Sequence, residues 1–132
     1  MKTVSLELSK QLKDAGYPQE SYFWWRVYDR TSEKEPHVVS KGEYERQYRE
    51  PIRDYIHIAS PLADEILDRL PFAVYIKKRT KKREFWFIVE RLSHGWWLRY
   101  QYGKETIAPV IERSITEAAA RCWLSLKKEN LL

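Results

Sequence analysis

The chain has 132 residues and a mass of 16.0 kDa, a length that fits one domain. Hydrophobic residues make up 43% and charged residues 33%, a globular composition that excludes a disordered chain. The single cysteine, Cys122, excludes an internal disulfide framework and a metal site built from several thiolates. No apolar run is long enough to span a membrane, and the first residues predict no signal peptide, so we expect a cytoplasmic protein.

The net charge of +5 comes from one short segment. Residues 77–83 contain six cations, and the rest of the chain contains 18 cations and 19 anions. A concentrated basic patch of this kind attracts phosphates or acidic proteins. Its residues are Lys77, Lys78, Arg79, Lys81, Lys82 and Arg83.

The first half of the chain predicts a helix, a strand and a long loop. Apolar residues at helical spacing from Val4 to Ala15 predict a helix that ends at Gly16. The aromatic segment 22–28 predicts a strand. Residues 29–51 are polar and predict a long, flexible loop, in which a short strand at 38–39 and a helical turn at 43–50 stay open.

The second half predicts two helices around a run of strands. Ser60 and Pro61 are typical of a helix start, and Ser114 with Glu117 forms the pattern of a capping box for the last helix. Between these helices the sequence predicts three antiparallel strands and then a loop over 103–113. The predicted strands cover 73–78, 84–91 and 96–102, with a further short strand at 52–58.

This order of elements predicts the α+β class in a single domain, 1–132. We expect an antiparallel sheet of about four strands, with three helices mostly on one face.

Alternation along the strands divides their side chains into two sets. The first set is apolar and is predicted to be core: Phe23, Trp25, Val27, Val74, Ile76, Phe85, Phe87 and Val89. The second mixes rings with cations and is the candidate interface or stacking face: Tyr22, Trp24, Arg26, Tyr28, Tyr75, Trp86, Trp97 and Arg99. Three interpretations of such a face remain open. It is covered by a helix or loop of the same chain, by a second copy or other protein partner, or by stacked nucleobases.

The basic run has two interpretations. At a hairpin tip, its six cations would contact a phosphate backbone. Alternatively, the run is a solvated charge cluster that protects the apolar strand segment 85–89 from aggregation.

We expect no enzyme activity, cofactor or metal. His37, His57 and His94 lie apart in sequence and have no ligand at metal-binding spacing. Cys122 falls on the apolar stripe of the last helix, so burial is predicted for it rather than catalysis.

Three segments of the chain, 6–16, 58–65 and 117–130, resemble a family of small uncharacterised proteins of bacteriophages and prophages. The resemblance covers helix-packing patterns and no catalytic signature. It implies a phage or prophage origin, a bacterial cytoplasm and a role in binding a host or phage partner.

The sequence therefore predicts a non-catalytic binding or self-associating module that uses its aromatic sheet face, as a homodimer or with a protein partner. The alternative is a nucleic-acid-binding protein that uses the basic hairpin at 77–83.

Overall fold

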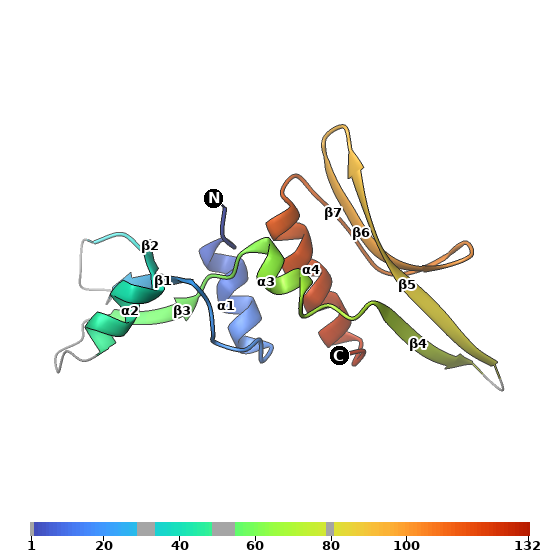
Figure 1. Cartoon of the computed structure of the whole chain (residues 1–132), viewed down its shortest axis with the longest axis horizontal. Helices are drawn as coiled ribbons and strands as arrows, with labels where there is room; N and C mark the ends of the chain where they lie inside the picture. The colour runs from blue at the N-terminus through green and yellow to red at the C-terminus, as the bar shows by residue number, and fades with distance from the viewer. Residues whose placement is uncertain (1, 29–33, 49–54, 79–80) are drawn as a thin grey trace.

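The computed structural model describes residues 2–28, 34–48, 55–78 and 81–132 (Figure 1). Over these ranges the chain forms helices and two antiparallel sheets, which confirms the predicted α+β class. The helices are α1 (Leu6–Asp14), α2 (Lys41–Tyr48), α3 (Ala63–Leu67) and α4 (Ile115–Lys128). The strands are β1 (Phe23–Tyr28), β2 (His37–Ser40), β3 (Tyr55–Ala59), β4 (Ala73–Lys78), β5 (Lys81–Leu92), β6 (Gly95–Tyr102) and β7 (Glu105–Glu112).

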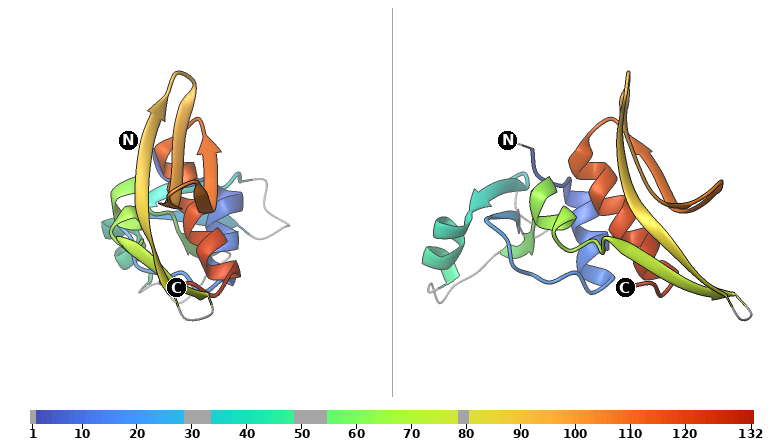
Figure 2. Two further views of the ribbon diagram at one scale, coloured as in Figure 1. Left: turned by 90° about the vertical axis from the view of Figure 1, so that its right-hand side faces the viewer. Right: turned by 45° about the vertical axis from the view of Figure 1, so that its right-hand side comes forward.

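The two sheets lie on opposite sides of a central group of helices. The small sheet has the order β2-β1-β3, and the large sheet has the order β4-β5-β6-β7. Helices α1, α3 and α4 stand between them, while α2 lies with the small sheet (Figures 1 and 2). The strands therefore form two sheets, where the sequence predicts one.

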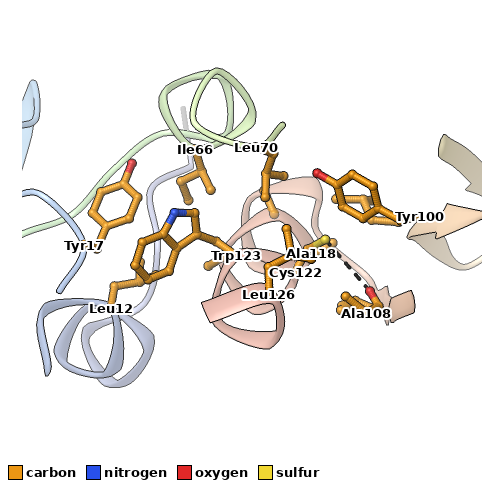
Figure 3. Close-up of a cluster of buried hydrophobic side chains, with 14 of the residues drawn as sticks. Leu12, Tyr17, Ile66, Leu70, Tyr100, Ala108, Ala118, Cys122, Trp123 and Leu126 are labelled. Carbon is orange, nitrogen blue, oxygen red and sulfur yellow. Dashed lines mark hydrogen bonds between the residues drawn. The ribbon is translucent and has the colours of Figure 1, made fainter. Parts of the chain in front are cut away.

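The main core lies between the central helices and one face of the large sheet. Its centre is α4, whose Ala118, Cys122 and Leu126 are completely buried (Figure 3). On one side Trp123 meets Tyr17 edge to face, and on the other α4 packs on β6 and β7. This packing leaves the opposite face of β4–β7 without a helix over it (Figure 2).

The starts of α1 and α4 are each capped by a serine, and one carboxylate joins the two helices. Ser114 accepts hydrogen bonds from the backbone N–H groups of Thr116 and Glu117, and Ser5 caps α1 in the same way. The Glu117 side chain does not complete the capping box at Ser114. Its Oε1 instead accepts from the backbone N–H of Ser5, 3.1 Å away, which ties the two helices together.

The loop predicted over 103–113 is wrong. Residues 103–113 hold β7, because Gly103 and Lys104 form a tight turn and the chain returns beside β6. In 29–51, the short strand and the helical turn that the sequence leaves open are present as β2 and α2, while 29–33 and 49–51 lie outside the described residues.

Two smaller predictions also need correction. Leu62, and not Ser60, occupies the N-terminal capping position of α3. The Ser60 hydroxyl instead donates a hydrogen bond to the Val4 carbonyl. Val89, predicted to be core, is exposed because the β5–β6 hairpin extends past the end of α4 (Figure 1).

Strand β7 contains a bulge that bends the large sheet. Leu98 pairs with Val110 and Tyr100 with Ile107, so two residues of β7, Ala108 and Pro109, stand opposite Arg99. Ala108 has a φ of 51° and is buried against α4, where its carbonyl faces the Cys122 thiol. The sheet curves with its concave side away from α4 (Figures 1 and 2).

Candidate functional site

The candidate site is the surface of β4–β7 that points away from α4, which we call the outer face. Trp86, Tyr75 and Ile111 are 56%, 53% and 64% exposed on it. Large apolar side chains gathered on one open surface are typical of an interaction site. Alternation and register give its members as Tyr75 and Lys77 of β4, Lys82, Glu84, Trp86, Ile88 and Glu90 of β5, Trp97, Arg99 and Gln101 of β6, and Ile111 of β7.

Cross-strand pairing holds these side chains in rows. Trp86 lies opposite Gln101, and Ile88 lies opposite Arg99. Trp97 lies between Glu90 on one side and Ile111 on the other. The two backbone ladders of β6 therefore determine which side chains are neighbours on the outer face before any partner arrives.

Arg99 lies near the centre of the outer face and is almost completely buried. Its guanidinium carbon is 3.5 Å from the centroid of the Trp97 ring, a close cation–π stack. Its Nε donates to Oε1 of Gln101 at 3.1 Å, and Nη2 lies 3.7 Å from Oε1 of Glu90. The remaining nitrogen, Nη1, is buried, and no described residue forms a hydrogen bond with it.

The basic run lies at the hairpin between β4 and β5, as predicted, and its residues divide between the two faces. Lys77 and Lys82 are cross-strand partners on the outer face, and Lys82 places its ammonium 4.2 Å above the Tyr75 ring. Arg83 points to the other face, where its Nη1 lies 2.7 Å from Oε1 of Glu105. Lys81 is exposed, whereas the Lys78 side chain and Arg79 lie outside the described part of the chain.

Both carboxylates that register places on the outer face are engaged. Glu84 accepts a hydrogen bond from the Tyr75 hydroxyl at 3.1 Å, and this bond raises the pKa of Tyr75. Glu90 pairs with Arg99. The Tyr75 hydroxyl is neutral and does not cancel the charge of the Glu84 carboxylate. Lys77, Lys82 and Arg99 therefore exceed the two carboxylates of this face by one cation.

The other half of the predicted aromatic face lies on the small sheet, so the prediction of one continuous face is wrong. Trp24 is buried under α2, with its ring stacked on Tyr44 at 4.1 Å. Arg26 is buried beside His57 and over the Tyr55 ring. Tyr28 also belongs to this cluster through its edge contact with Tyr55, and Tyr22 is exposed just before β1.

Burial on β1 is the reverse of the prediction. Phe23, Trp25 and Val27, predicted to be core, are only half-buried. On one side of β1, Tyr44 of α2 packs on Trp24. On the opposite side, Trp25 donates a hydrogen bond to the carbonyl of Val4, which precedes α1. For this half of the face, coverage by the same chain is the interpretation that the structure supports.

Sequence reasoning missed Glu84, Glu90 and Ile111 as members of the outer face. The two glutamates occupy the predicted strand at the correct parity, so alternation alone would have found them. Ile111 was missed because its strand was read as a loop.

In the described ranges, the cysteine, histidine and acidic residues outside the outer face form no second candidate site. Cys122 is buried as predicted, and burial raises the pKa of its thiol to about 12. Among the described residues, no cluster of His, Cys, Asp and Glu is placed to hold a metal ion. None of the described helices has the length and apolar character needed to cross a membrane. Comparison with protein-family models, curated proteins and solved structures gives no match.

Proposed function

We propose that this protein is a binding module that holds single-stranded nucleic acid on its outer face. The observation that carries the proposal is the presence of exposed rings and an excess of cations over carboxylates on one open surface. Tyr75 and Trp86 are more than half exposed there, and Lys77 and Lys82 lie on the same face at its basic end. Nucleobases stack on such rings while lysine and arginine meet the phosphates.

Charge favours an anionic partner over a second copy of the chain. A second copy would bring its own Lys77 and Lys82 to a surface that already carries one more cation than carboxylates. Phosphates would meet these lysines directly. Single strands are favoured over duplexes because only unpaired bases present their faces to an aromatic side chain.

The resemblance to small phage proteins indicates the source of this nucleic acid. We propose that the nucleic acid is that of a phage or its bacterial host.

Fluorescence anisotropy with labelled oligo(dT) and oligo(U) tests the proposal. Each base stacked on a ring contributes about 1–3 kcal/mol, so we expect Trp86→Ala to weaken binding at least about fivefold. Trp86 is exposed on the sheet surface, and its removal leaves the core intact.

Tyr22→Ala is the matched control, since Tyr22 is an exposed ring outside the outer face. We expect it to bind as the wild type does. Failure of the wild type to bind either oligonucleotide at low salt, or equal binding by Trp86→Ala, would refute the proposal.

Self-association through the same face is the second candidate. It is favoured by the exposed apolar side chains of Trp86 and Ile111, which two copies could bury against each other. Light scattering after size-exclusion chromatography tests it, and a strict monomer at high micromolar concentration would remove it. A dimer that Ile111→Glu converts to monomer would support it.

A further inference from the structure

The feature that carries a further inference is the ion pair between Arg99 and Glu90 on the outer face. The Arg99 side chain is 8% exposed, and the Glu90 side chain is 49% exposed. Their separation of 3.7 Å is beyond the range of a direct hydrogen bond. Nη1 of Arg99 has no hydrogen-bond partner among the residues that the structure describes. The charge of this nearly buried guanidinium is therefore only partly balanced by the Glu90 carboxylate. This is an unfavourable state for a charge removed from water.

The guanidinium is nevertheless held in a fixed orientation. Trp97 supports one side of its plane, and Gln101 fixes its Nε. Neither contact depends on Glu90. If the Glu90 carboxylate moved away, Arg99 would keep its orientation, because two of its three contacts would remain.

We propose that Arg99 is a phosphate-binding position of the outer face and that the Glu90 carboxylate occupies it in the free protein. This inference rests on the proposed function. A phosphodiester presents two acceptor oxygens, which match the planar donor set of arginine better than a single carboxylate oxygen at 3.7 Å does. Binding of the strand therefore displaces Glu90 into solvent, where its half-exposed side chain already reaches.

The rings on either side suit this position. Trp97 neighbours Arg99 on β6, and Trp86 lies opposite Gln101 on β5. A phosphate at Arg99 would lie between two surfaces on which successive bases stack.

Glu90→Gln tests the displacement, because it removes the competing charge and keeps the size of the side chain. An exposed or partly exposed ion pair contributes about 0.2–1 kcal/mol, so we expect oligo(dT) affinity to rise about 1.4- to fivefold. Arg99→Met should lower affinity and reduce the slope of log K against log salt by about 0.7, the value for one phosphate on a single strand.

The double variant separates direct competition from long-range charge. With Arg99→Met already in place, we expect Glu90→Gln to give no further gain. Glu84→Gln is the matched control, since Glu84 lies on the same strand and face but is bound by Tyr75. Its effect should be the same with and without Arg99→Met.

A gain from Glu90→Gln that persists in the Arg99→Met background would overturn the inference and leave the proposed function standing. So would an unchanged affinity in both single variants. Absence of binding by the wild type and by Glu90→Gln would overturn both proposals. If Arg99→Met does not fold, as circular dichroism would show, Arg99→Lys replaces it; lysine lacks the planar donor set, and the gain from Glu90→Gln should then shrink.

Discussion

Tyr44 of α2 lies flat on Trp24 of β1, with ring centroids 4.1 Å apart and planes 5° from parallel. This stack is the main contact between α2 and the small sheet, whose buried core in the described residues is Trp24, Val39 and Ala59. The small sheet therefore depends on very few side chains, whereas the core around α4 is extensive.

We expect Tyr44→Ala to destabilise the small sheet selectively. An aromatic pair contributes about 0.5–1.5 kcal/mol beyond the area it buries, and the small core has little else to replace it. Hydrogen exchange should accelerate at β1 and β2 amides and stay slow in α4. Tyr44→Phe keeps the ring and should retain most of the protection. Equal acceleration in α4 would show that the two cores unfold together.

Loss of the Glu117 carboxylate should loosen the junction of α1 and α4. Because this group satisfies the Ser5 N–H at the start of α1, Glu117→Ala should lower the free energy of unfolding by about 1 kcal/mol. Urea titration measures this value. Glu7→Ala, which removes an exposed carboxylate from the first turn of the same helix, is the control and should cost less.

Two glycines should respond to alanine in opposite directions. A Cβ at Gly95 would lie 2.4 Å from the Glu112 carbonyl oxygen, so Gly95→Ala must push β7 from β6 and should cost about 1–3 kcal/mol. A Cβ at Gly42 in α2 would meet only the Ser40 hydroxyl at 3.9 Å. Gly42→Ala should therefore be neutral or stabilising by up to about 1 kcal/mol. Thermal unfolding of both variants checks the contrast.

Stability should fall in alkaline solution. Burial raises the pKa of Tyr17 to about 12 and that of Cys122 to about 12, and it also raises the pKa of Tyr100. The unfolded chain ionises these groups first, near their ordinary values of 9.0 for the thiol and 10.0 for the phenols, so it binds fewer protons than the folded chain. Their contribution is complete below pH 9 and is lost as pH rises toward 12. Urea midpoints from pH 7 to 11 should show the decline, and Cys122→Ala should make it shallower.

The outer-face lysines should set the salt dependence of oligonucleotide binding. Lys77→Ser with Lys82→Ser removes two cations from this face, and the slope of log K against log salt should decrease by about 1.4. Lys10→Ser with Lys13→Ser removes the same charge from exposed positions on α1. An equal change in both pairs would mean that net charge, and not this face, governs binding.

The helices were the most predictable part of the fold. Ser114 caps α4 as expected, since a hydroxyl that accepts from a free N–H acts locally. Burial of Leu8, Leu12 and Cys122 follows from spacing alone.

Strand partnership was not predictable in the same way. Trp24 and Trp86 share aromatic character and strand parity, yet they lie on different sheets, because β1 pairs with β2 and β3 and not with β5. Pairing between distant segments depends on the whole chain, so alternation gives faces within a strand but not between sheets. The outer-face half of the candidate site was therefore predicted by residue, and its separation from the small-sheet half was not.

Strand β7 was missed for a local reason. Pro109 stands in the middle of an apolar run, and proline in a central strand would remove a ladder hydrogen bond. In the structure β7 is an edge strand and Pro109 belongs to its bulge, where that loss is tolerated.

The bulge at Pro109 also makes one edge of the large sheet irregular. β7 is an edge strand, Pro109 has no N–H, and the neighbouring Ala108 has a positive φ. A strand from another molecule would find no regular ladder there, which disfavours edge-to-edge pairing. A protein with a broad, exposed aromatic surface benefits from such an irregular edge, because association is then confined to one face of the sheet.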